Sequence, residues 1–238
     1  MPATSQTGFA PTILIVGASR GLGHAIAAEY LRRDWNVVGT VRAGGRTKLH
    51  DLAEEHGNRV EVETLDIERQ EEIAALRSRM ADRVLDTLFV NAGATVHDEQ
   101  VPIGDVTTDE FAHVMVTNAL GPMRVIEAFQ DLVPASGLIG AMSSGQGSIA
   151  NNDKGLHELY RGSKAALNMF MKSFAARQTG VARAMVLIAP GWVRTELGGP
   201  DAPLGVGDSV PSVVNVLLSE QGKPGLRFLD RNGKVVPW

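Results

Sequence analysis

The chain has 238 residues, a formal net charge of −4 and 44% hydrophobic residues. That is enough apolar material for one large core, and a mild negative charge without a basic stripe argues against nucleic acid as a partner. There is no cysteine, which excludes disulfides, thiolate metal sites and cysteine nucleophiles and fits a reducing compartment such as the cytoplasm.

The first residues are small and polar, so we expect a flexible tail over residues 1–11, not a signal peptide. We expect the remainder, residues 12–238, to form one domain. No stretch approaches the roughly 18 to 20 uninterrupted apolar residues that a membrane helix needs, so no membrane partner is expected.

From residue 12 onward, short β-branched runs alternate with longer segments of helical periodicity. The predicted strands are Thr12–Val16, Asn36–Val41, Arg59–Leu65, Val84–Val90, Leu138–Met142, Ala184–Ala189 and Leu226–Leu229. The predicted helices are Leu22–Arg33, Arg46–His56, Glu68–Met80, Thr108–Val133 with an interruption at Gly121-Pro122, Glu158–Gln178 and Ser209–Leu218. This alternation implies right-handed βαβ crossovers. It predicts an α/β fold, a single doubly wound, Rossmann-like parallel sheet with helices on both faces.

A glycine-rich turn, Gly17-Ala18-Ser19-Arg20-Gly21-Leu22-Gly23, joins the first predicted strand to the first predicted helix. Residues without Cβ let the backbone bend and let its N–H groups approach a phosphate, and the following helix points its positive end there. Its place in the first βα unit predicts a dinucleotide site to which Ser19 and Leu22 also belong. A tight connection without a ligand is the alternative.

The end of the second predicted strand bears on which dinucleotide would bind. NAD sites generally place an acid there for the ribose 2′-hydroxyl, but this chain has Arg42. Arg42 and Arg20 would give a 2′-phosphate both charge and bidentate geometry. The residues therefore favour NADP over NAD, unless both arginines are plain surface residues.

Tyr160 and Lys164 are four residues apart on a predicted helix, which places their side chains on one face. An unperturbed tyrosine, with a pKa of about 10, exchanges protons poorly near neutrality, and a neighbouring ammonium favours the phenolate. The spacing alone is common on helices. This spacing indicates a catalytic pair only together with the polar residues expected nearby.

Two strands are followed by polar residues at the carboxyl edge of the predicted sheet, where open α/β sheets bind ligands. Ser143 and Ser144 follow one strand, and Asn91-Ala92-Gly93 follows the strand before it. Asn118 lies inside an apolar helical run, so it is either functional or a core amide with local partners.

Taken in order, these motifs resemble those of the short-chain dehydrogenase/reductase family. The matching residues are Gly17, Gly21, Gly23, Asn91, Ala92, Gly93, Asn118, Ser144, Tyr160, Lys164, Pro190 and Gly191. Residues 145–152, 160–168 and 190–195, and the ending Val236-Pro237-Trp238, are similar to the branch that contains C-factor and sniffer-type carbonyl reductases.

The resemblance implies an NADP-dependent oxidoreductase that reduces a ketone or aldehyde, or oxidises the alcohol, by hydride transfer. Tyr160 would act as general acid or base, and Ser144 would hydrogen-bond the carbonyl oxygen. Lys164 would lower the pKa of Tyr160 and hold the nicotinamide ribose, while Asn118 would keep a water that links Lys164 to solvent. The implied cofactor contacts also include Asp66, Asn91, Ala92, Gly93, Pro190, Gly191, Val193 and Thr195. The family further suggests a homodimer or homotetramer.

Three departures from the family pattern concern the site. Val16 replaces the usual threonine before the glycine loop. The spacing from Ser144 to Tyr160 is longer than usual, which predicts an insertion over 147–156 near the pocket. Ser143 adjoins Ser144, and the resemblance favours Ser144 because the second serine of such a pair is the catalytic one in the family, with Ser143 as the alternative.

Two other functions remain open, a dinucleotide-binding sensor with little catalysis and a sugar-nucleotide epimerase or dehydratase. The complete set of polar motif residues argues against a sensor, and the short C-terminal part argues against an epimerase. We expect no metal, because the adjacent residues His97-Asp98-Glu99 do not converge on one ion. We interpret His157-Glu158 as a helix start and residues 196–208 as a substrate lid.

Overall fold

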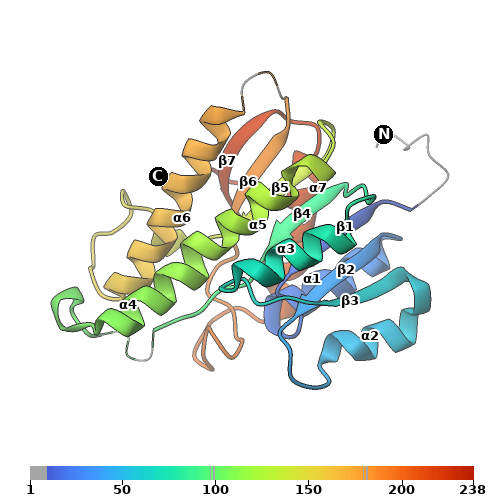
Figure 1. Ribbon diagram of the computed structural model, residues 1–238. Helices are drawn as coiled ribbons and strands as arrows, with labels where there is room; N and C mark the ends of the chain where they lie inside the picture. The colour runs from blue at the N-terminus through green and yellow to red at the C-terminus, as the bar shows by residue number, and fades with distance from the viewer. Residues whose placement is uncertain (1–9, 97, 99, 179, 181) are drawn as a thin grey trace.

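Seven strands form one sheet in the computed structural model, which describes residues 10–96, 98, 100–178, 180 and 182–238. Their order is β3-β2-β1-β4-β5-β6-β7, and every neighbouring pair is parallel (Figure 1). The strands are β1 (Thr12–Val16), β2 (Asn36–Val41), β3 (Val60–Thr64), β4 (Thr87–Val90), β5 (Leu138–Met142), β6 (Ala184–Ala189) and β7 (Gly225–Asp230). The predicted doubly wound α/β fold is confirmed.

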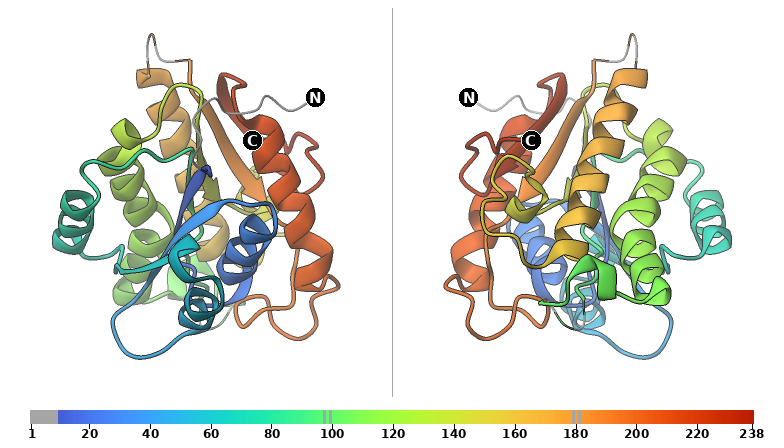
Figure 2. Two further views of the ribbon diagram at one scale, coloured as in Figure 1. Left: turned by 90° about the vertical axis from the view of Figure 1, so that its right-hand side faces the viewer. Right: turned by 90° about the vertical axis from the view of Figure 1, so that its left-hand side faces the viewer.

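Helices cover both faces of the sheet, as the two side views in Figure 2 show. The helices are α1 (Gly21–Arg32), α2 (Lys48–His56), α3 (Gln70–Arg79), α4 (Thr108–Met115), α5 (Gly121–Phe129), α6 (Glu158–Arg177) and α7 (Val206–Glu220). Helices α1, α2 and α7 pack on one face, and α3, α5 and α6 pack on the other.

The strands supply both cores, because successive side chains of a strand point to opposite faces. In β1, Leu14 and Val16 face the α3, α5 and α6 layer, and Ile13 and Ile15 face the α1, α2 and α7 layer. Burial on both faces explains why the sequence shows continuous apolar runs here in place of an alternating pattern.

The predicted helix over 108–133 is divided in a different way from the sequence expectation. A π-helical turn, Val116–Leu120, lies between α4 and α5, and Gly121 N–H donates to the Val116 carbonyl five residues earlier. Pro122 has no N–H for the Asn118 carbonyl, so a regular α-helical ladder is impossible at this point. The irregularity therefore falls on the turn that contains Asn118, just before the predicted interruption.

Some predicted ends shift because of local contacts. Strand β4 begins at Thr87 and not at Val84, whose side chain is exposed. Of the predicted tail, residues 1–9 lie outside the described residues, while Ala10 and Pro11 accept hydrogen bonds from Asn36. Among the described residues, no helix is long and apolar enough to cross a membrane.

Phe129→Ala should destabilise the protein strongly, because Phe129 is fully buried in the core beside α3, α5 and α6. Removing a buried phenyl ring leaves a cavity, and we expect a loss of about 3–5 kcal/mol in the free energy of unfolding. The matched control is Phe111→Ala, at a position 46% exposed, for which we expect about 1 kcal/mol or less. Urea unfolding of both variants measures this, and equal losses would contradict the core assignment.

Candidate active site

A cleft of about 1250 Å³ lies along the carboxyl edge of the sheet. Its lining comes from the loops that follow β1 to β6 and from helix α6. Three of the four predicted catalytic residues, Ser144, Tyr160 and Lys164, contribute to it, and the fourth, Asn118, does not. A second hollow of about 880 Å³ adjoins the cleft, and the two share Ser19, Arg20, Arg42, Lys48 and Asp66. The fold therefore gathers residues that are far apart in the chain at one sheet edge, as expected for parallel α/β sheets.

The glycine loop packs against the segment after β4 so closely that side chains do not fit. A Cβ on Gly17, whose φ is +88°, would lie 2.8 Å from the backbone of Ala92. A Cβ on Gly23 would lie 2.0 Å from the Gly17 carbonyl oxygen. Asn91 Nδ2 donates to that same oxygen at 2.8 Å. These glycines hold the turn in the compact form that a phosphate cradle needs.

Thr40 also supports this loop. Its Oγ1 accepts a hydrogen bond from Gly17 N at 2.9 Å, and its carbonyl accepts from Ala18 N at 2.8 Å. A hydroxyl of strand β2 thus ties the glycine loop to that strand, while Asn91 ties it to the segment after β4. Thr40 stands in the predicted strand, but its contact with Gly17 depends on the pairing of β1 with β2, which the linear sequence does not specify.

The smaller hollow contains several cations beyond the end of β2. Arg20 and Arg42 both line it, as does Lys48, which no motif indicates. Arg20 Nη1 also lies 2.5 Å from a carboxylate oxygen of Glu196 in the segment after β6. The two predicted 2′-phosphate ligands therefore share one hollow, and Arg20 links it to the predicted lid.

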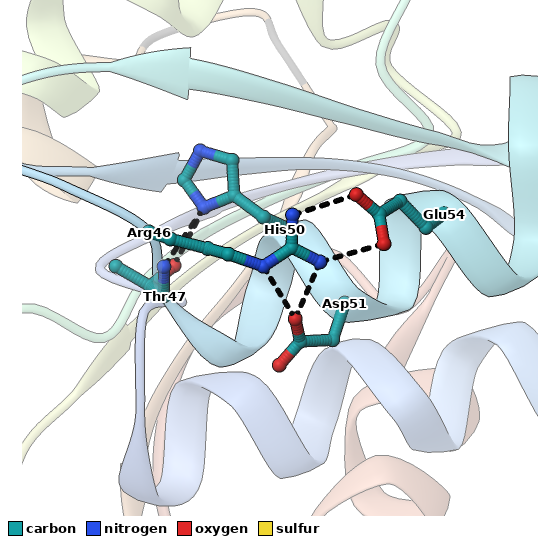
Figure 3. A network of polar contacts seen from close by, with 5 residues as sticks. All are labelled: Arg46, Thr47, His50, Asp51 and Glu54. Atoms are coloured by element: carbon teal, nitrogen blue, oxygen red, sulfur yellow. Dashed lines mark hydrogen bonds and ion pairs between the residues drawn. The ribbon is translucent and has the colours of Figure 1, made fainter.

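Arg46 lies at the same hollow but is directed onto helix α2 (Figure 3). Its guanidinium donates to Asp51 Oδ1 and to both carboxylate oxygens of Glu54, at distances of 2.6–2.9 Å. The same figure shows Thr47 against His50 Nδ1, the contact with which α2 begins. Arg46 is thus neutralised by neighbouring carboxylates, whereas no described carboxylate pairs with Arg42 or Lys48.

Lys164 lies beneath Tyr160 on helix α6. Its Nζ is 5.8 Å from the centroid of the Tyr160 ring and donates to the Met142 carbonyl at 3.1 Å. The lysine is only 4% exposed, and this burial lowers the pKa of its ammonium from 10.5 to about 8.

Asn118 connects the segment after β4 to helix α6. Its Oδ1 accepts from Ala94 N at 2.7 Å, and its Nδ2 donates to the Ala94 carbonyl and to Ser163 Oγ. Ser163 in turn donates to the Tyr160 carbonyl at 2.8 Å. A Cβ on Gly93 would lie 3.2 Å from Asn118 Oδ1 and 3.4 Å from Lys164 Nζ, so these groups adjoin one another. The amide of Asn118 is fully engaged with protein partners.

The two adjacent serines have different surroundings. Ser143 is buried, and its Oγ donates to Asn168 Oδ1 at 2.6 Å. Ser144 is half-buried at the cleft, and its Oγ accepts from Gln146 N at 3.1 Å. This geometry favours Ser144 as the serine available to a ligand. Gln146 lines the cleft as well, although no motif indicates it, and its Oε1 has no hydrogen-bond partner among the described residues.

The other predicted cofactor residues also line the cleft, namely Gly21, Leu22, Asp66, Pro190, Gly191, Val193 and Thr195. Gly191 has a φ of +86°, and a Cβ there would be 2.7 Å from Leu204. Thr195 Oγ1 accepts from Gly198 N at 3.0 Å, which orders the start of the predicted lid. Gly23 is absent from the cleft lining because it packs beneath the loop.

The predicted insertion over 147–156 ends in an unusual backbone. Gly155, Leu156 and His157 have successive φ values of +63°, +58° and +54°, and α6 begins at the next residue. His157 lines the cleft, while Glu158 Oε2 accepts from Ile103 N at 3.0 Å. Of the three-residue cluster considered for metal, His97 and Glu99 lie outside the described residues. The rest of the described chain holds no group of three or more potential ligands.

A family model described as short chain dehydrogenase matches residues 11–202. The chain belongs to the short-chain dehydrogenase/reductase family. A Burkholderia multivorans protein assigned to the same family, solved with bound NADP, is 63% identical and superposes with a TM-score of 0.95. That comparison covers 96% of this chain and 100% of the other.

Two further relatives of this short-chain dehydrogenase/reductase represent the predicted branch. The C-signal protein of Myxococcus xanthus is 38% identical over 156 residues, which are 65% of this chain and 93% of the relative. The carbonyl reductase Sniffer of D. melanogaster is 28% identical with a TM-score of 0.84, over 96% of this chain and 100% of the other. The predicted family, its branch and the enzyme class are therefore confirmed.

Lys164→Met should change how the stability of this enzyme depends on pH. Because the folded-state pKa of Lys164, about 8, lies below the value of 10.5 for a free lysine, the buried charge destabilises the fold below about pH 8. This penalty disappears as the pH rises towards about 10. The quantity to compare is the melting temperature of Lys164→Met minus that of wild type. We expect this difference to be about 5–10 °C lower at pH 10 than at pH 7. Calorimetry measures this, and a difference in melting temperature that does not change with pH would contradict the lowered pKa of Lys164.

Proposed function

We propose that this chain is an NADP-dependent reductase of ketones or aldehydes, in which Tyr160 gives the proton to the carbonyl oxygen. The observation that carries the proposal is the meeting of Ser144, Tyr160 and Lys164 at the cleft that also contains the glycine loop. Cofactor and carbonyl group would then lie within reach of one another. The reverse reaction, oxidation of the matching alcohol, uses the same groups.

The residues present fit a dinucleotide with a 2′-phosphate. Gly17 and Gly23 let the glycine loop pack compactly against the segment after β4. Helix α1 begins directly at this loop, and its first residues Gly21 and Leu22 line the cleft where a phosphate would lie. Arg42 and Lys48 add cations where a 2′-phosphate would lie, and the Burkholderia relative was solved with NADP. When bound, NADPH supplies the hydride.

Side chains of the protein donate the proton and stabilise the negative charge that forms on the substrate oxygen. Ser144 Oγ accepts from Gln146 N, which leaves its own O–H to donate to a carbonyl oxygen. The Lys164 ammonium, 5.8 Å from the Tyr160 ring, favours the phenolate and so eases loss of the tyrosine proton. A positioned acid of this kind contributes about 10²- to 10⁴-fold to a rate.

The substrate end of the cleft favours an apolar or aromatic group beside the carbonyl. Trp192 lines it with 56% of its surface exposed, and so does Leu197, five residues later, which is 44% exposed. The indole Nε1 donates to the Gly198 carbonyl at 2.6 Å, which fixes the ring in place. Large apolar side chains in a ligand cleft gain free energy when a ligand covers them.

Tyr160→Phe should abolish most of the turnover while leaving cofactor binding nearly intact, because only the proton donor is lost. We expect kcat to fall by about 10²- to 10⁴-fold. The measurement is loss of NADPH absorbance with a panel of aromatic, aliphatic and charged carbonyl compounds. If wild type turns over none of them but binds NADPH tightly, the chain is a dinucleotide sensor and the proposal fails.

Arg42→Ala should weaken the binding of NADPH much more than the binding of NADH, because only NADPH carries the 2′-phosphate. Loss of a charge-assisted hydrogen bond costs about 1.5–3 kcal/mol, or about 10- to 100-fold in Kd. Fluorescence titration with both cofactors measures this. The matched control is Arg46→Ala, which should have a much smaller effect because Asp51 and Glu54 already bind that guanidinium. Equal weakening of NADPH and NADH would contradict the assignment of Arg42.

A further inference from the structure

Helix α6 carries a buried polar residue, Asn168, one turn beyond the predicted catalytic pair. Tyr160, Lys164 and Asn168 follow one another at four-residue spacing, so they share one face of the helix. Asn168 is 4% exposed. The proposed reaction assigns it no role, and a buried amide is kept in a protein interior only where its hydrogen bonds are satisfied.

Both halves of the Asn168 amide bind the turn that follows β5. Ser143 Oγ donates to Asn168 Oδ1 at 2.6 Å, and Asn168 Nδ2 donates to the Gly147 carbonyl at 3.1 Å. These two anchor points enclose the three residues Ser144, Gly145 and Gln146. One side chain therefore fixes both ends of the turn that carries the candidate catalytic serine.

Within this turn, backbone contacts set the direction of the Ser144 side chain. Gln146 N donates to Ser144 Oγ at 3.1 Å, and Gly147 N donates to the Ser144 carbonyl at 2.9 Å. The hydroxyl oxygen is thereby occupied as an acceptor. Any shift of Gln146 relative to Ser144 would release it and let the hydroxyl rotate.

The turn also lies in direct contact with α6. A Cβ on Gly147 would be 2.9 Å from Lys164 Cβ and 3.0 Å from Asn168 Nδ2. Lys164 itself reaches the Met142 carbonyl at the end of β5. The turn is therefore packed directly on the helix that carries Tyr160. A small displacement of the turn would change the distance between Ser144 and Tyr160.

We propose that Asn168 is a positioning residue, which holds the turn over 143–147 so that the Ser144 and Tyr160 hydroxyls can both hydrogen-bond the same substrate oxygen. This inference rests on the proposed carbonyl reduction for its kinetic consequence. Its structural part, the clamp on the turn, stands on the hydrogen bonds alone.

The kinetic test is a double-mutant cycle between Asn168→Leu and Ser144→Ala. We expect Asn168→Leu alone to lower kcat by about 10- to 100-fold, as small misplacements of reacting groups do, with the Kd for NADPH changed less than about threefold. In the Ser144→Ala background, the same change should cost less than about threefold. An equal cost in both backgrounds would mean that Asn168 does not act through the serine, and would overturn the proposal.

The second readout does not require turnover. Hydrogen exchange of the amides of Gln146, Gly147 and Ser148 should become at least about tenfold faster in Asn168→Leu, because their turn loses both anchors. Unchanged exchange would also overturn the proposal. If wild type reduces no carbonyl compound, the proposed function fails while the exchange experiment still decides the clamp.

Two variants separate positioning from general destabilisation. Ser143→Ala removes one of the two anchors and should shift kcat and exchange in the same direction by a smaller amount, which keeps the test available if Asn168→Leu does not fold. Thr87→Val removes a buried hydroxyl at the start of β4, where it accepts from Gln221 Nε2. This control should lower the melting temperature and leave kcat and the exchange of the turn unchanged; a matching loss of kcat would contradict positioning.

Discussion

The attachment of helix α6 to the end of strand β5 is the constraint on which the candidate site depends. It is made by polar side chains that reach backbone atoms, with the Lys164 ammonium on the Met142 carbonyl as its central contact. Burial of this ammonium destabilises the fold at neutral pH, but it places a positive charge beside Tyr160. The protein tolerates that local cost because two large apolar cores flank the sheet.

The cofactor half of the cleft depends on a different constraint, the close approach of backbone to backbone. The glycine loop, the end of β2 and the segment after β4 meet where Gly17, Thr40 and Asn91 exchange hydrogen bonds. Rigid packing of this kind prepares the loop for a phosphate before any ligand arrives, which reduces the ordering cost of binding. The two halves of the cleft join at Gly93, which adjoins both Asn118 and Lys164.

Much of this architecture could be predicted from the sequence, because local signals specify it. Apolar runs and helical periodicity give the strands and helices, and residues directly after strands, such as Asn91 and Ser144, fall at one edge by topology. Contacts between elements were not predictable. The support of Gly17 by Thr40 depends on strand pairing, and the pairing of Ser143 with Asn168 depends on helix packing, so neither spacing nor residue type indicated them. The π-helical turn at Asn118 likewise results from Pro122 within a packed helix.

The left-handed backbone of Leu156 and His157 has an electrostatic consequence for Tyr160. Because right-handed helical geometry cannot extend back through these residues, α6 begins abruptly at Glu158 and Tyr160 falls in its first turn. The aligned peptide dipoles of a helix place about half a positive charge at this end, and side chains of a helix tilt towards it. A negative charge forming on the phenol oxygen would therefore be favoured by the amino-terminal end of α6 as well as by Lys164.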